Sequence, residues 1–175
     1  VLAGNPAVAA GLPPERSDIL GLMELIGAYP DDGSGDPGFY IGAVDIELDL
    51  AQQGLGVLRL GLLDPVASGP AVDRIELLIT ANGTNLVDLV FDSLLTALAE
   101  LDDRLFDLDL AAVDLGSGLL DLHVELDVLA HLPAAGFALT LLLASVPEPA
   151  LPWLLGLGLA LVAGRRSGRR AATAG

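Results

Sequence analysis

Apolar and polar residues alternate one by one over several stretches of this chain, which is the period of a strand with one buried face. The clearest stretch is residues 43–50, where Val44, Ile46, Leu48 and Leu50 oppose Asp45, Glu47 and Asp49. The alternation returns over residues 58–62, 75–79 and 120–128, and an apolar run follows over residues 137–143. Because successive strand side chains point to opposite faces, these patterns predict half-buried strands.

Turn residues separate the predicted strands. Asp64-Pro65 predicts the end of the strand over residues 58–62, since proline donates no backbone hydrogen bond. Asn82-Gly83 stands between two strand-like runs and predicts a type I′ hairpin, whose two central residues need positive φ. The glycines and aspartates of residues 31–38 predict a loop.

Two segments have apolar residues at helical spacing instead. Residues 17–28 predict a short amphipathic helix with Ser17 as its N-cap. Residues 91–105 predict a second helix with Asp92 as its N-cap. In this helix Glu100 and Arg104 are spaced for an i,i+4 ion pair. Residues 1–14 have no clear period and predict an irregular lead-in.

These elements predict a mainly β protein. Short connections and strands with one apolar face favour antiparallel sheets, so we expect an antiparallel β-sandwich with one inserted α-helix, a short N-terminal helix and a C-terminal single transmembrane helix. The expected divisions are a lead-in over residues 1–37, a β-sandwich over 38–145 and a C-terminal signal over 146–170. Residues 144–150 are the one linker-like tract.

Three features follow one another at the C-terminal end. The first is a short signature, the second an apolar run over residues 150–164 and the third a basic cluster. Each proline of the signature favours an extended conformation in the residue before it, and Glu148 is the expected recognition residue. As a helix the apolar run would rise about 22 Å, so it spans a bilayer only with help from local thinning, from Trp153 in the headgroup region and from the arginines. The signature is Val146, Pro147, Glu148 and Pro149, the expected membrane anchor includes Trp153, Leu154, Leu155, Leu157, Leu159, Leu161 and Val162, and the expected cytoplasmic stop is Arg165, Arg166, Arg169 and Arg170.

This arrangement resembles the PEP-CTERM sorting domain of exported proteins from Gram-negative bacteria that make exopolysaccharide. The resemblance covers residues 146 to about 170. It implies that the Pro-Glu-Pro signature is recognised by exosortase, a multi-pass membrane transpeptidase, which would be the chain's partner together with the inner membrane.

The arginine cluster also indicates the direction of export. By the positive-inside rule it stays in the cytoplasm, so the residues before Ala150 must be translocated. We expect an N-terminal signal peptide to precede Val1 in the precursor. The expected location is transiently the inner membrane, and then the cell surface or the extracellular matrix.

Charge and composition exclude several classes of function. The formal net charge of -16 opposes binding to nucleic acid, whose phosphates the chain would repel. The absence of cysteine excludes a disulfide framework and thiol catalysis. No acid pair, nucleophile elbow or HExxH spacing singles out a catalytic residue: Ser117 stands in an ordinary Gly-Ser-Gly turn, and His123 and His131 are expected surface histidines.

We therefore expect a non-enzymatic surface or matrix protein. The alternatives are an exopolysaccharide-binding module, for which Tyr29, Phe39 and Tyr40 are the available aromatic residues, a calcium-stabilised adhesin and a small hydrolase. Calcium is the one cofactor considered. A site would need carboxylates from neighbouring strands, and the candidates are Asp45, Glu47 and Asp49 with Asp121, Glu125 and Asp127. The loop residues Asp31, Asp32 and Asp36 lack the spacing of an EF-hand and predict turns.

Overall fold

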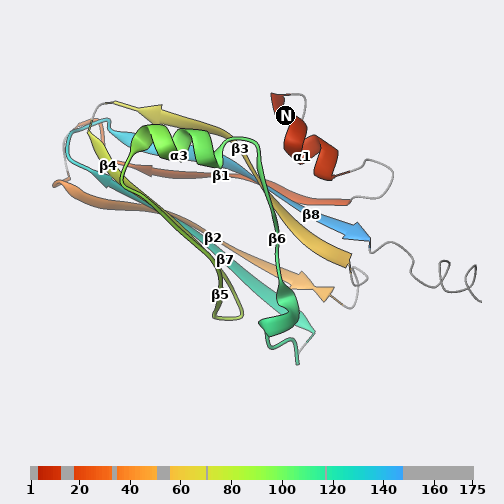
Figure 1. The fold of residues 1–175 in the computed structure, drawn as a ribbon. Coiled ribbons are helices and arrows are strands. Elements are labelled where there is room, and N and C mark those ends of the chain that lie inside the picture. The colour runs from red at the N-terminus through yellow and green to blue at the C-terminus, as the bar shows by residue number, and fades with distance from the viewer. Residues whose placement is uncertain are drawn as a thin grey trace, which may run out of the picture.

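Two four-stranded antiparallel sheets pack face to face in the computed structural model, which describes residues 4–12, 18–32, 35–50, 56–69, 71–116 and 118–147 (Figure 1). Sheet A has the order β1 (Asp18–Ala28), β8 (Gly136–Pro147), β3 (Gly56–Ser68) and β6 (Arg104–Asp107). Sheet B has the order β2 (Gly38–Asp49), β7 (Leu119–Ala130), β4 (Val72–Ala81) and β5 (Thr84–Phe91). The predicted β-sandwich is confirmed.

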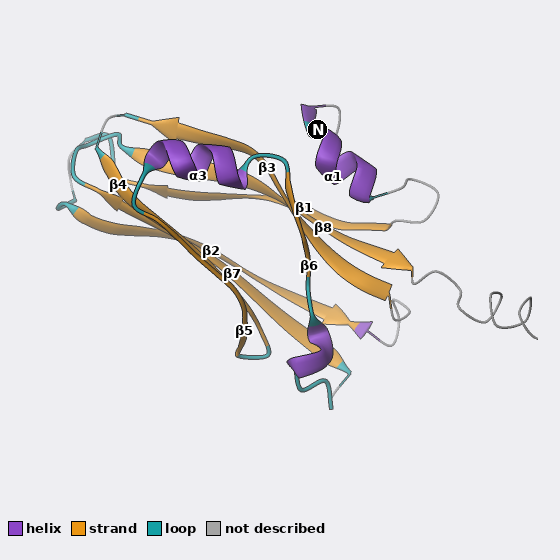
Figure 2. Cartoon of the chain, viewed as in Figure 1, coloured by secondary structure: helices purple, strands orange, loops and turns teal. Residues whose placement is uncertain are grey.

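Short helical elements accompany the sheets, as Figure 2 shows. In the described part of the chain they include α1 (Pro6–Gly11), α3 (Leu94–Leu101) and the 3-10 helix η2 (Leu110–Ala112). The helix α1 lies on the outer side of sheet A, whereas α3 lies beside β3, β4 and β5 and covers that side of the sandwich. Within the described residues, no helix is long and apolar enough to cross a membrane.

The space between the sheets is filled by the residues that the alternation predicted to be buried. On β7 every second side chain from Leu120 to Val128 is fully buried, and β4 and β3 repeat this pattern. Their outward neighbours are charged or polar on β7 between Leu120 and Val128, and on β4 they are charged or polar except for Leu78, so one sequence period sets both faces of these strands. The central residues of this core are Leu58, Leu60, Leu62, Ile75, Leu77, Ile79, Leu120, Leu122, Val124, Leu126, Val128, Phe137, Leu139, Leu141 and Leu143.

The hairpin and the inserted helix are confirmed, with a shift in the helix boundaries. Asn82 and Gly83 both have positive φ, and they join the antiparallel strands β4 and β5. The helix α3 is shorter than predicted, and its N-cap is Ser93, whose hydroxyl accepts a hydrogen bond from the Thr96 N–H, rather than Asp92. The predicted ion pair is present, with Arg104 Nη1 at 3.3 Å from Glu100 Oε2, although Arg104 belongs to β6.

The helix predicted over residues 17–28 is wrong, because residues 18–28 form β1, the edge strand of sheet A. Ile19, Leu22 and Ile26 point outward from the sheet and are more than half exposed, while Met23 and Leu25 contact the core. Since both faces of β1 carry apolar residues, its sequence lacks the alternation of a half-buried strand and imitates helical spacing. Ser17, the predicted N-cap, lies outside the described residues.

Two further corrections concern segments predicted to be irregular. Within the predicted lead-in, residues 6–11 form α1, which begins at Pro6, a residue suited to the first turn because its missing N–H has no partner there. The prediction of a linker over residues 144–150 is also wrong in part, because β8 continues through Pro147.

The predicted break at Asp64-Pro65 is a bulge rather than an end. The strand β3 continues to Ser68, and its register against β8 shifts between Leu63 and Val66. Asp64 has a φ of 49°, so the chain makes room locally for a proline that cannot donate to the ladder.

The strands β7 and β8, which come latest in the described part of the chain, each lie between two other strands of their sheet. In sheet B, β7 pairs with β2 and β4, and in sheet A, β8 pairs with β1 and β3. At one side of the sandwich β1 and β2 come so close that a Cβ on Gly42 would lie 2.4 Å from the Ile26 carbonyl oxygen. Glycine is therefore required where the two sheets meet.

Candidate functional site

The first two residues of the predicted processing signature form the end of β8. Val146 is paired with Val57, and Pro147 is paired with Gly56, both of β3. Pairing with β1 reaches β8 only at Ser145, which is opposite Asp18. The other predicted site residues lie outside the described residues: Glu148, Pro149, Trp153, Leu154, Leu155, Leu157, Leu159, Leu161, Val162, Arg165, Arg166, Arg169 and Arg170.

The helix α1 packs on the outer face of sheet A, beside this end of β8 (Figure 1). Val8 is fully buried and Leu12 nearly so, in a small apolar cluster separate from the main core. On β3, Gly61 leaves the space that Val8 fills, since a Cβ on that glycine would lie 3.0 Å from Val8 Cγ1. The sheet residues of the cluster are Leu63, Leu142 and Ala144, with Leu105 and Val146 packed against them.

Polar contacts hold both ends of α1 to the sheet. At its start, the Ala7 N–H donates to Asp103 Oδ2 at 2.7 Å and the Val8 N–H donates to Asp103 Oδ1 at 3.0 Å. At its end, the Arg59 guanidinium donates to the Gly11 carbonyl oxygen and also forms an ion pair with Asp107 at 2.6 Å. We call this clamped segment, residues 5–12, the N-terminal strap.

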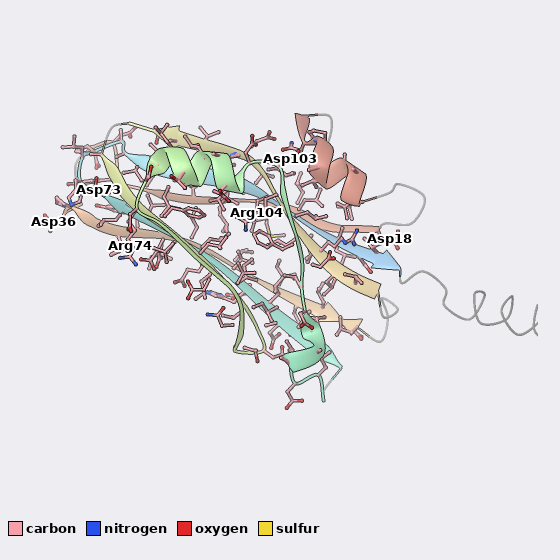
Figure 3. The ribbon with its side chains drawn as sticks, viewed as in Figure 1. Asp18, Asp36, Asp73, Arg74, Asp103 and Arg104 are labelled. Carbon is pink, nitrogen blue, oxygen red and sulfur yellow. The ribbon has the colours of Figure 1, made fainter. Side chains whose placement is uncertain are left out.

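Asp103 is placed for this contact by the tight turn between α3 and β6, where Figure 3 labels it. Its φ is 51°, a left-handed conformation that aspartate tolerates better than most residues. The two N–H groups that it accepts from are at the helix start, where they have no partner within the helix. A single carboxylate thus joins two segments that are 96 residues apart in the chain.

The sequence did not indicate the strap. Asp103 follows Asp102 in an acidic stretch, and no pattern distinguishes a carboxylate that caps a distant helix from one that faces solvent. For Arg59 the sequence does carry a signal, because an arginine on the outward side of an otherwise apolar strand indicates a partner on that face.

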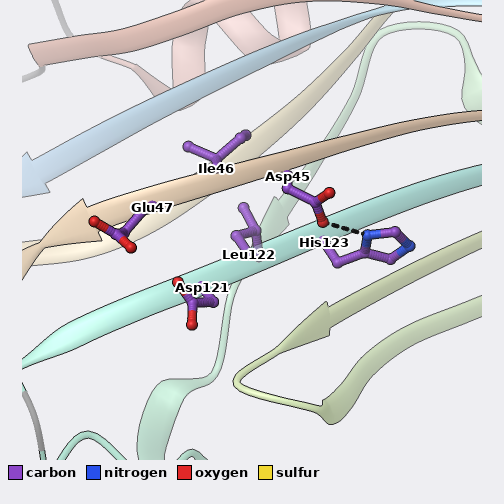
Figure 4. Close-up of a pocket in the computed structure, with 6 residues that line it drawn as sticks. All are labelled: Asp45, Ile46, Glu47, Asp121, Leu122 and His123. Carbon is purple, nitrogen blue, oxygen red and sulfur yellow. Dashed lines mark hydrogen bonds and ion pairs between the residues drawn. The ribbon is translucent and has the colours of Figure 1, made fainter.

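The outer face of sheet B has a different character, because it carries most of the carboxylates predicted to lie on solvated strand faces. Asp45 is opposite His123, and Glu47 is opposite Asp121. Between these strands lies a shallow hollow of about 410 Å³, shown in Figure 4. It is lined by Asp45, Ile46, Glu47, Asp121, Leu122 and His123.

The imidazole of His123 lies between two carboxylates. Its Nδ1 is 2.6 Å from Asp45 Oδ1, and its Nε2 is 3.2 Å from Glu125 Oε2. Because a carboxylate only accepts, both ring nitrogens act as donors when the ring is protonated. The hydrogen bonds with Asp45 and Glu125 accordingly raise the pKa of His123 above its ordinary value. His131, the other predicted surface histidine, lies 2.7 Å from Asp73.

Asp127 is the least favourably placed carboxylate of this face. Partial burial, together with the negative charges of Glu125 and Glu76, raises the pKa of Asp127. Its Oδ1 is buried and accepts no hydrogen bond. The ionised form is thus destabilised by lost hydration and by like charges.

The strands carrying the predicted calcium ligands are neighbours, which was the condition set by the sequence. Among residues 4–147 as far as they are described, no three histidine or carboxylate side chains are grouped to hold a metal ion. Calcium stays a prediction.

The aromatic residues considered for sugar binding contact one another. Tyr29 and Tyr40 stack with ring centroids 5.1 Å apart, and Tyr29 is buried. The Tyr40 hydroxyl donates to the Asp36 carbonyl oxygen at 2.6 Å, and the Tyr29 hydroxyl donates to that of Gly35. The pair therefore closes the loop before β2, whereas Phe39 is half exposed.

No family model, no curated protein and no solved structure matches this chain.

Proposed function

We propose that this chain is an exported, non-enzymatic surface or extracellular-matrix protein that an exosortase-type membrane transpeptidase processes at the C-terminal Pro-Glu-Pro signature. The sandwich is the delivered part, and residues 150–170 are a temporary inner-membrane anchor with an arginine stop. In the processing step the C–N bond of one peptide unit breaks. The carbonyl carbon of that unit forms a new bond to the oxygen of water or to the nitrogen of an amine acceptor. The tail is the leaving group, and its nitrogen takes up a proton to become a new amino terminus.

The observation that supports this proposal most is the position at which the sandwich ends. The last strand of the described residues, β8, runs to Pro147, inside the signature, and the described core lies before that residue. Loss of the residues after Pro147 would remove no side chain of the described core. A described core that lies before the end of β8 at Pro147 is suited to delivery by a removable tail.

The order of the tail features is a second support. A signature, an apolar run and four arginines follow in sequence, and the apolar run is short for a bilayer of roughly 30 Å hydrocarbon thickness. A short span anchors weakly, which suits an anchor that is later removed.

Mass spectrometry of the protein from its native envelope tests the proposal. We expect a C-terminus near the signature and no peptide from residues 151–170. Glu148→Ala should abolish this processing, whereas Glu24→Ala, which removes an exposed glutamate from β1, should leave it unchanged. An intact tail in the wild-type protein would contradict the proposal.

The alternative function, a calcium-stabilised or polysaccharide-binding module, has its nearest support in the carboxylates that β2 and β7 bring together around the hollow. A melting temperature unchanged by chelator would exclude stabilisation by calcium. Assays of the purified protein on polysaccharides and esters test the hydrolase alternative, for which we expect no turnover.

A further inference from the structure

The strand that leads into the signature also holds sheet A together. Within this sheet β1 and β3 each pair with β8 and not with each other. Near its end, β8 contributes to both apolar clusters. Leu141 and Leu143 belong to the main core between the sheets, whereas Leu142 and Ala144 belong to the cluster under α1, against which Val146 packs. A cut within β8 would therefore expose core residues and separate β1 from β3.

The paired part of β8 comes very close to the predicted anchor. Only three residues lead from Pro147, which is paired with Gly56, to Ala150, where the apolar run begins. Three residues span at most about 10 Å when fully extended. An enzyme that acts at the membrane surface thus meets the folded sandwich directly beside the bond it must cut.

The N-terminal strap is part of the barrier to such an enzyme. Val146 packs against the cluster formed by Val8, Leu12, Leu63, Leu142 and Ala144, so opening the end of β8 disrupts contacts with α1. Asp103 and Arg59 fix α1 in that place through its first and last turns. Proteolytic enzymes act on segments that are open, in proportion to the population of the open state.

We propose that the strap and the β3 pairing together restrict processing to the bonds after Pro147, and that the strap sets how often the end of β8 opens to the enzyme. This inference rests on the proposed function, because it concerns the same processing step. The first bond beyond the paired strand is Pro147–Glu148, and Val8 is the positioning residue on the strap. The folded body, as well as the signature, then determines where the chain is cut.

The test uses the full-length chain in its native envelope, with pulse-chase measurement of the processing rate and mass spectrometry of the new C-terminus. Val8→Ala leaves a gap in the strap cluster, and we expect processing to become about tenfold faster, with some cuts before Pro147. Val72→Ala is the matched control, since it removes the same atoms from a buried valine on β4 of sheet B. In this control we expect the wild-type rate and C-terminus.

The outcomes separate this inference from the proposed function. If the two valine variants change processing equally, global stability governs the rate and the strap has no particular role. If Val8→Ala is processed like the wild-type protein, the inference is wrong although processing itself occurs. If the wild-type tail is never removed, the proposed function is wrong, and this inference about its processing step is wrong with it.

Discussion

The outer faces of the two sheets differ, although the inner faces are alike. Sheet B exposes carboxylates from β2, β7 and β4, with the apolar residues Phe39 and Ile41 exposed at one end of β2. Sheet A exposes aliphatic side chains from β1 and β3, and α1 covers a further part of that face. On sheet A these exposed aliphatic residues are Ile19, Leu22, Ile26 and Val66, with exposed fractions of 51–60%.

This difference shows that the two outer faces differ in how far another element of the chain covers them. On sheet B the outward side of β2 and β7 carries carboxylates, and the apolar residues beside them, such as Ile41 with an exposed fraction of 61%, stay uncovered. On sheet A several outward residues of β8 and β3 are apolar, namely Leu63, Leu142, Ala144 and Val146, and a helix from the other end of the chain packs on them. Sheet A therefore depends on α1, and the contacts that hold α1 become important to the end of β8.

The largest effect should come from the place where the two sheets meet. In Gly42→Ala the new Cβ would collide with the backbone of Ile26 in β1, and we expect a loss of about 3 kcal/mol in the free energy of unfolding. Gly38→Ala is the control on the same strand, because its Cβ would lie 3.8 Å from the nearest atom. Denaturant unfolding measures both variants, and equal stabilities would contradict the close approach of β1 and β2.

A smaller loss should follow removal of the carboxylate that caps α1. Asp103→Gly keeps the left-handed turn free of strain but deletes both acceptors, and we expect a loss of about 1–2 kcal/mol. The control is Asp102→Gly, which changes the exposed neighbouring carboxylate. Hydrogen exchange at Ala7 and Val8 should rise in the first variant only, and unchanged protection there would disprove the cap.

On sheet B, neutralising Asp127 should stabilise the protein. Because its pKa is raised in the folded state, Asp127 disfavours folding at pH values above that folded pKa, and it has no such effect below the pKa of the unfolded chain. We expect Asp127→Asn to gain a few tenths of a kcal/mol to about 1 kcal/mol at pH 7, discounted for its partial exposure. Thermal unfolding at pH 7 and pH 3 checks this; a gain of equal size at both values would refute the electrostatic cause.

The smallest effect should be the pH dependence that His123 adds. Its raised pKa means that it stabilises the folded state fully below the unfolded pKa, about 6.5, and that this contribution is lost as pH rises through the folded pKa. His123→Gln should therefore lower the melting temperature at pH 5.5 and change it little at pH 9. Asp45→Asn should reduce the same pH dependence, and a pH-independent difference would exclude this ion pair as the cause.

Sheet B shows how much of the fold could be predicted from the sequence. Its strands β2, β4 and β7 alternate between apolar and polar residues, and Asn82-Gly83 identifies the β4–β5 hairpin. The same reasoning was wrong for β1, because the apolar residues on its outer face hide the period of a strand. It also could not predict α1, a six-residue helix whose stability comes from tertiary contacts.

The residues of the candidate site also fall into those that the sequence predicted and those that it did not. The sequence alone pointed to the signature through the order of its three features, and it identified the carboxylates and His123 as polar-face residues. It could not tell that Asp45 lies opposite His123, since register depends on which strands are neighbours. The roles of Asp103 and Arg59 also depend on contacts between segments that lie far apart in the chain.

What the sequence by itself determined are the properties that depend on near neighbours: strand alternation, turns, the acidic body and the composition of the tail. Only the tertiary structure decided which strands pair, that β8 joins β1 to β3 and continues to Pro147, and that α1 covers its end. The physical reason is that local patterns follow from the period of each element, whereas pairing and capping depend on groups brought together by burial of the whole core.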